Sequence, residues 1–330
     1  MSPRTTSSPP AAGAASPTPA GGLPLAPRSR RGDHIVSAVA GLALTPLVLV
    51  LIALALQGAN EGRLLLATAP VVLMLVVSAC AQALFAARSS LGGLVAGALA
   101  LIALPVLAAR SQAGSSNTAA WLLDLVHTGV VPVLSALLIG GAWGMRHARR
   151  AGRAEARLAA RLAAHDRTVG RTPAAPPSRR RDHIVSLPLT LAAALIAVVV
   201  LREDNAQVLA GTAGPGTWAG AVCTWGAVAA GTAITGRSSL GARAIGPLLV
   251  LAGLPALLTV ARPGLPGQGA VADWLPGDPR ALTLICSGLL LMALGWGAHL
   301  ARRQGRTEVL AERRPQDPTT PPLGLARPGT

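Results

Sequence analysis

The sequence predicts an all-α polytopic membrane protein, with eight transmembrane helices arranged as two tandem four-helix repeats. Hydrophobic residues make up 51% of the chain and charged residues only 13%, whereas about a quarter of the residues in a soluble domain are charged. The mean hydropathy is +0.51. The apolar residues gather into long runs, and short polar motifs between these runs occur twice. These three observations favour a duplicated bundle embedded in a bilayer.

Eight segments are long and apolar enough to be spans, because a helix needs about 20 mostly apolar residues to cross the hydrocarbon core. They cover roughly residues 35–56, 64–86, 90–109, 121–144, 184–201, 207–234, 239–260 and 281–299. The fifth is expected to be short, since Arg202, Glu203 and Asp204 follow it directly. Pro215 predicts an irregular outer end for the sixth.

Two motifs occur in both halves of the chain. Residues 29–37 and 178–186 are identical at eight of nine positions, at an offset of 149. Residues 88–92 return unchanged as 237–241 at the same offset. Each half has an even number of predicted spans, so both halves enter the membrane in the same direction. We therefore expect parallel units related by a pseudo-two-fold axis along the membrane normal.

The correspondence continues at the ends of the fourth and eighth spans. The pair Trp143-Gly144 returns as Trp296-Gly297 at an offset of 153. The arginines and the glycine of residues 149–153 return in residues 302–306 at the same offset. The change from 149 to 153 indicates an insertion in a loop, where added residues are best tolerated.

Arginine placement orients the predicted bundle. If the N-terminus is cytoplasmic, 24 of the 29 arginines lie in cytoplasmic segments, as the positive-inside rule requires. Both termini are then cytoplasmic, in a plasma-membrane protein without a cleavable signal peptide, since the first 27 residues contain no apolar core. The predicted parts are a disordered Pro/Ala/Ser-rich tail (1–28), the first repeat (29–145), a basic amphipathic helix with a Pro-rich linker (146–177), the second repeat (178–301) and a basic tail (302–330).

The repeated polar residues fall at the predicted cytoplasmic ends of helices. We predict that eight of them cap or clamp these ends: Asp33, Arg88, Ser89, Ser90, Asp182, Arg237, Ser238 and Ser239. The aspartates and serines precede spans, where they can accept hydrogen bonds from free N–H groups. Arg88 and Arg237 lie on the same membrane face as the aspartates. We therefore expect ion pairs of Asp33 with Arg88 and of Asp182 with Arg237.

Four titratable residues are candidates for function. His34 and His183 repeat and titrate near neutral pH, so they are either cytoplasmic pH sensors or solvated anchors. Asp124 and His127 lie three residues apart on one face of the fourth span, close to its outer end. They are either a proton-accepting pair at the mouth of a pathway or a solvated pair at the boundary. Pro132, which follows them, predicts a kink.

The linker after the fourth span predicts a basic amphipathic helix. Its basic face is expected to consist of Arg149, Arg150, Arg153, Arg157 and Arg161. Such a face suits anionic lipids of the cytoplasmic leaflet. The alternative is an anchor that only fixes the orientation of the chain.

The sequence contains no catalytic constellation, metal-ligand spacing or cofactor motif that we recognise. An intramembrane enzyme would have only Asp124 and His127 to use. A basic surface interleaved with aromatic residues is absent, so no nucleic-acid partner is expected. We expect a non-enzymatic scaffold or accessory subunit that acts through its Arg-rich cytoplasmic segments. The alternative is a permease or exporter for an apolar or small neutral solute, with its pathway between the repeats.

Overall fold

The computed structural model describes residues 30–112, 125–170, 172, 180–259, 278 and 280–313. This part of the chain is almost entirely helical and contains no strand. The helices are α1 (Arg31–Asn60), α2 (Leu64–Ala87), α3 (Leu91–Gln112), α5 (Val130–Thr168), α6 (Arg180–Ile196), α7 (Arg202–Leu209), α8 (Pro215–Ala233), α9 (Leu240–Leu258) and α11 (Leu282–Arg313), with a π-helical segment η2 (Ala197–Leu201) and a 3₁₀ turn η3 (Ile234–Gly236).

Seven helical stretches in the described residues are long and apolar enough to cross a membrane. They are α1, α2, α5, α8, α9, α11 and the stretch that begins with α6. The third predicted span lies in α3, whose described apolar part, Leu91–Leu107, is shorter than the others. The chain is thus a multi-pass helical membrane protein whose described residues include seven candidate spans, and the third predicted span would lie in the shorter helix α3.

The fifth span is longer than the sequence predicted. Helix α6 continues through η2 into α7 and ends at Leu209, so the sharp end expected at Arg202 is wrong. Arginine and glutamate are good helix formers, and charges at the end of a span do not interrupt the backbone hydrogen bonds. The buried side chain of Asn205 donates a hydrogen bond of 3.0 Å to the carbonyl of Val126, which fixes this end of the helix against the chain before α5.

Proline and glycine set the starts of two further helices. Pro215 is the first residue of α8, where its missing N–H is not needed, and Gly211 turns the chain just before it with φ of 70°. Pro132 lies in the first turn of α5. The chain bends at Gly129, with φ of 72°, so a helix start takes the place of the kink predicted at Pro132.

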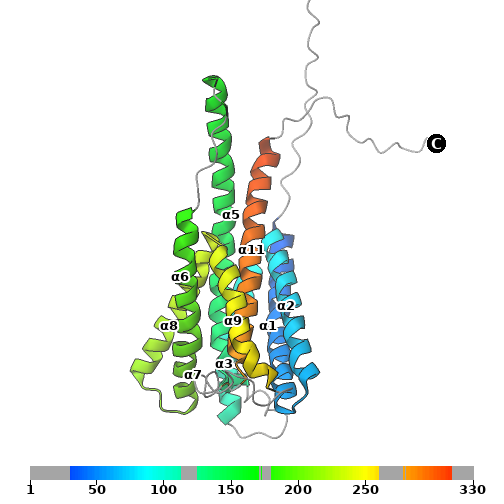
Figure 1. Cartoon of the computed structure of the whole chain (residues 1–330), viewed down its shortest axis with the longest axis vertical. Coiled ribbons are helices and arrows are strands. Elements are labelled where there is room, and N and C mark those ends of the chain that lie inside the picture. Colours follow the sequence, from blue (N-terminus) through cyan, green and yellow to red (C-terminus); the bar gives the residue numbers. More distant parts are fainter. Residues whose placement is uncertain are drawn as a thin grey trace, which may run out of the picture.

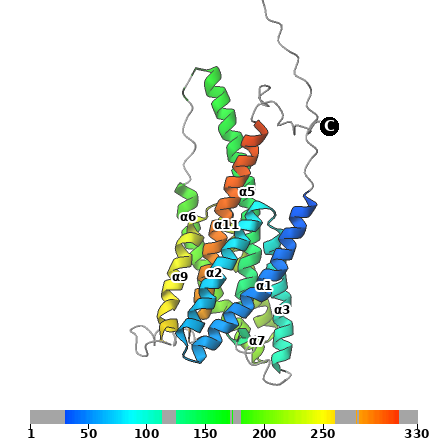
Figure 2. The ribbon, with the colours of Figure 1, turned by 90° about the vertical axis from the view of Figure 1, so that its right-hand side faces the viewer.

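Helices α5 and α11 form the centre of the bundle (Figures 1 and 2). They make the most extensive contact between any two helices. Helices α3 and α8 pack against α5, while α9 and α2 pack against α11. Helix α1 packs against α2 and α3, and α6 packs against α8 and α9. With 39 and 32 residues, α5 and α11 extend beyond the other helices at one end of the molecule (Figure 1).

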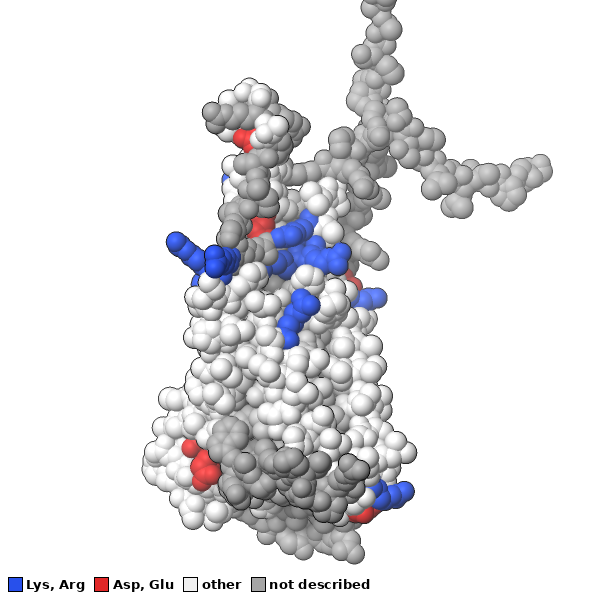
Figure 3. Space-filling view, viewed as in Figure 1, with Lys and Arg blue, Asp and Glu red and all other residues white. Residues whose placement is uncertain are grey.

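Charged side chains gather at the two ends of the long axis. On the face in Figure 3, arginines form a belt near the end where α1 and α6 begin and α5 and α11 finish. We call this end the Arg-rich end. Between it and the few charges at the opposite end, the described surface on this face is almost free of charge. Such an uncharged band is what a lipid-covered surface requires.

Close helix contacts hold the centre of the bundle. A Cβ atom added to Gly141 would lie closer than 3.0 Å to the Leu294 side chain of α11, and one on Gly140 would meet the Ala229 backbone of α8. Small residues allow such close approach of backbones, which is how helices associate in lipid. Helix α5 therefore packs closely against both α11 and α8.

Candidate functional site

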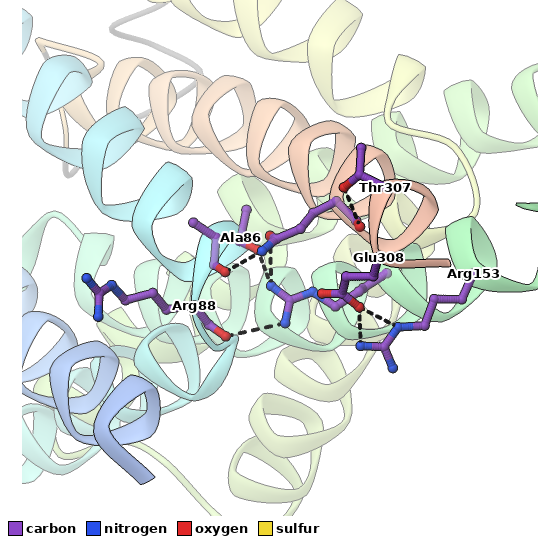
Figure 4. A network of polar contacts seen from close by, with 8 residues as sticks. Ala86, Arg88, Arg153, Thr307 and Glu308 are labelled. Atoms are coloured by element: carbon purple, nitrogen blue, oxygen red, sulfur yellow. Dashed lines mark hydrogen bonds and ion pairs between the residues drawn. The ribbon is translucent and has the colours of Figure 1, made fainter. Parts of the chain in front are cut away.

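Two ion pairs of the same kind join α5 and α11 at the Arg-rich end. Arg153 of α5 donates from Nε to Glu308 of α11 at 2.7 Å. Arg306 of α11 donates from Nη2 to Glu155 of α5 at 2.6 Å. In these two pairs each helix contributes one arginine and one glutamate. Arg302 of α11 lies 3.7 Å from Glu155 and adds a third, longer ion pair between the helices. The Arg153–Glu308 pair is seen in Figure 4.

Two glycines let the same helices touch beside these ion pairs. A Cβ atom on Gly152 would lie closer than 3.0 Å to the carbonyl oxygen of Arg302. A Cβ atom on Gly305 would lie equally close to the carbonyl oxygen of Arg149. The backbone of each helix therefore fills the space that a side chain would need on the other.

Arg149 and Arg302 donate hydrogen bonds to backbone carbonyls at the C-terminal ends of other helical segments. Arg149 donates to the carbonyls of Ala86 and Arg88 and, at 3.2 Å, to Gln304 Oε1 (Figure 4). Arg302 donates to the carbonyl of Arg237 at 2.9 Å. The last carbonyls of a helix lack partners within it, so these guanidinium groups satisfy groups at the ends of α2 and η3.

The predicted lipid-facing row of arginines is therefore wrong in part. Arg149 and Arg153 are half-buried and bound within the molecule, because α11 covers their side of α5. Arg150, Arg157 and Arg161 are exposed, as a lipid-facing role requires. The helical pattern identified which residues share a face, but not that another helix packs against part of it.

The repeated histidines contact the repeated serines. His34 Nδ1 lies 2.8 Å from Ser89 Oγ, and His183 Nδ1 lies 2.8 Å from Ser238 Oγ. Each hydroxyl oxygen also accepts an N–H from the first residue of the next helix, at 3.2 Å in α3 and 3.3 Å in α9. Each serine is thereby held between its histidine and the start of a helix.

The other predicted caps differ from the expectation. Among the described contacts, neither Ser90 nor Ser239 makes a capping hydrogen bond, and the first serine of each pair accepts the N–H instead. Asp33 and Asp182 lie within the first turns of α1 and α6. Their charge still faces the positive end of the helix dipole from there.

Only one of the two predicted aspartate–arginine contacts is present. Arg88 Nη1 lies 3.2 Å from Asp33 Oδ1, with both side chains partly exposed. In the described part of the chain, no ion pair within 4.0 Å joins Asp182 to Arg237. Both instead border a cavity of about 770 Å³ between α5, α6 and the η3 segment.

The same helix crossing accompanies both motifs. A Cβ atom on Gly92 would lie closer than 3.0 Å to the carbonyl oxygen of Ser37, and one on Gly241 would meet that of Ser186 in the same way. Helix α1 therefore touches α3 where Ser37 meets Gly92. Helix α6 touches α9 where Ser186 meets Gly241. The two motifs are one contact surface, although 55 residues separate the histidine from the serine in each.

A second cavity at the Arg-rich end has a volume of about 400 Å³ and is called the basic cavity here. Its charged lining consists of Arg30, Asp33, Arg88, Arg146, Arg149, Arg150, Arg153 and Glu308. It lies between the start of α1, the turn between α2 and α3, and the middle of α5. By contrast, a cavity among α1, α2, α3, α5 and α11 holds only about 10 Å³, about the least that one water molecule needs.

The remaining candidates give no assembled site. Asp124 lies outside the described residues, and His127, which precedes α5, is exposed. Among the residues that the structure describes, no cluster of His, Cys, Asp and Glu could hold a metal ion. Sequence reasoning missed Glu155 and Glu308, although they are a matching pair at the offset of 153 in the printed sequence.

Long apolar helices, an uncharged central band and an Arg-rich end define a multi-pass helical membrane protein. No known family, no curated protein and no solved structure matches the chain. The function must therefore be inferred from the site itself.

Proposed function

We propose that the chain is a duplicated membrane scaffold whose two four-helix units, residues 29–145 and 178–301, cross the membrane eight times in the same direction. The histidine–serine contact supports this proposal, because it recurs with the same atoms and the same 2.8 Å distance. Two of the ion pairs between α5 and α11 support a pseudo-two-fold axis between these helices, since Arg153–Glu308 and Arg306–Glu155 are the same contact with the helices exchanged.

The turns after α1 and α7 also support the duplication. Gly62 and Gly211 have φ of 73° and 70°, and they are separated by the same 149 residues as the motifs. In both turns the residue after the glycine donates its N–H to the carbonyl five residues back, at 2.8 and 3.1 Å. This is the Schellman motif. Its recurrence is expected if α1 and the α6–α7 stretch are equivalent helices.

The scaffold role rests on the paired extension of α5 and α11 beyond the bundle. The ion pairs Arg153–Glu308 and Arg306–Glu155 join the two helices there. The helices also touch at Gly152 and Gly305. Arg157 and Arg161 are exposed on it. In this proposal both termini are cytoplasmic, and the extension presents Arg157 and Arg161 to a partner protein beyond the membrane surface. The close glycine packing of α5 against α11 and α8 is the observation that favours a scaffold over a permease with a pathway between the units.

The test is recovery of a partner in mild detergent from cells that produce the tagged full chain. We expect a specific partner with the unaltered chain and much less of it when Arg157 and Arg161 are both changed to Gln. The change Arg63→Gln removes an exposed charge from the opposite end and should leave recovery unchanged. Equal recovery with all three chains contradicts the proposal. Saturable uptake of a small neutral solute by vesicles that contain the chain would favour the permease instead.

A further inference from the structure

The basic cavity carries more positive charge than its carboxylates can neutralise. Six arginines and two carboxylates line it. The carboxylates are already engaged, Asp33 by Arg88 at 3.2 Å and Glu308 by Arg153 at 2.7 Å. Four arginines therefore remain around one cavity without a carboxylate partner.

These four arginines come from two parts of the fold. Arg149 is bound only by uncharged groups, namely two backbone carbonyls and Gln304. The guanidinium groups of Arg30, Arg146 and Arg150 make no described hydrogen bond or ion pair. Arg30 immediately precedes α1, whose free N–H groups add to the positive potential there. Four positive groups held near one another repel, and an anion between them removes this repulsion.

The apolar side of the cavity strengthens the attraction for an anion. Phe85, Met145 and Ala301 line it, and each is at most 1% exposed. Charges that face such a surface are less screened than charges in open solvent. The volume of about 400 Å³ is ample for a phosphate group and part of the molecule that carries it.

The depth of the cavity suits a group in the headgroup layer. Trp143 is half-exposed on α5, about one turn before Arg146, and Trp296 is half-exposed on α11. Tryptophan concentrates at the boundary between the hydrocarbon core and water. The cavity therefore opens at the level where the phosphates of membrane lipids lie.

We propose that the basic cavity is a binding site for a phosphate group, which Arg146, Arg150 and Arg30 contact directly. The planar guanidinium group can give two parallel hydrogen bonds to phosphate oxygens, so arginine suits this ligand better than any other side chain. An anionic phospholipid headgroup and a soluble phosphate share this chemistry. The site rests on the proposed orientation, with the Arg-rich end at the cytoplasmic leaflet, but not on the existence of a protein partner.

The test uses the full chain in phosphatidylcholine nanodiscs, with two separate ligands. One arm titrates inorganic phosphate, and the other adds phosphatidylglycerol to the nanodisc and counts retained lipids by native mass spectrometry. The cavity variant changes both Arg146 and Arg150 to Gln. The matched control changes both Arg157 and Arg161 to Gln, which removes the same charge from the same helix outside the cavity.

We expect the cavity variant to weaken binding by about tenfold or more in at least one arm, while the control changes it less than about twofold. The arm that responds identifies the source of the phosphate. Equal weakening in the two variants, or no binding in either arm with the unaltered chain, overturns the proposal. Partner recovery depends on Arg157 and Arg161 instead, so failure of the scaffold role and failure of this site are distinguishable.

A second measurement needs no substitution. Phenylglyoxal modifies accessible arginines, and mass spectrometry follows each site in the unaltered chain. Bound phosphate or phosphatidylglycerol should slow modification of Arg146 and Arg150 several-fold and leave Arg157 unchanged. Equal protection of all three sites, or protection of none, overturns the proposal even if the cavity variant fails to fold.

Discussion

Replacing Gly152 with leucine is expected to separate the two central helices at the Arg-rich end and to lower the thermal stability of the full chain strongly. The new side chain would meet the carbonyl oxygen of Arg302, which belongs to the backbone of α11 and cannot turn aside. Overpacking of this kind costs about 1–3 kcal/mol where side chains can adjust. We expect a value at the upper end or beyond, because here the whole helix must move.

The reciprocal change Gly305→Leu should have nearly the same effect, since it meets the carbonyl oxygen of Arg149 in the same way. The control is Gly226→Leu in α8, where nothing lies within 4 Å of an added Cβ atom. Circular dichroism on heating in detergent gives the comparison. If Gly152→Leu unfolds at the temperature of the control, α5 and α11 do not cross as described.

The glycine that ends the second motif, Gly92 in one half and Gly241 in the other, is expected to be the second most sensitive position. The change Gly241→Val would push the new side chain against the carbonyl of Ser186 and the hydroxyl of Thr190. The change Gly92→Val would meet Phe85 and the carbonyl of Ser37. We expect each to cost about 1–3 kcal/mol, because both force apart two helices that touch through their backbones.

These two variants also test the equivalence of the units. Duplicated contacts should lose similar stability in both halves, as measured by the midpoint of thermal unfolding. The control Gly216→Val places valine in α8 at a position with open space around it. A large loss for Gly92→Val together with no loss for Gly241→Val would contradict equivalent packing of the two motifs.

The positions of most helices could be predicted from the sequence, since length and apolarity decide them. The predicted second span, 64–86, differs from α2, Leu64–Ala87, by one residue. The end predicted for the fifth span at Arg202 is wrong, because the charges there do not stop the backbone hydrogen bonds, which continue past them. The direction of the charge asymmetry, with arginines at one end, was also predictable from their order along the chain.

Contacts between distant segments were predicted less well. The pairing of Asp33 with Arg88 followed from two charges placed at one end of neighbouring helices. The contacts of Arg149 and Arg153 with α11 could not be predicted, since a helical pattern does not show which helix packs against each face. The histidine–serine contact joins residues 55 positions apart. Repetition of both motifs marked them as important but did not show that they meet.

The most direct test of the central claim, two units that cross the membrane in the same direction, is the sidedness of four single cysteines. Glu61→Cys and Ala210→Cys place equivalent exposed residues at the ends of α1 and α7. Ala159→Cys and Ala311→Cys mark the exposed extensions of α5 and α11. Each is made in a chain whose three native cysteines are serine.

A membrane-impermeant maleimide added to intact cells should label the cysteines at 61 and 210. It should label those at 159 and 311 only after the membrane is opened. Labelling of 61 and 210 from opposite sides of the membrane would mean that the two units are inverted, and it would contradict the account.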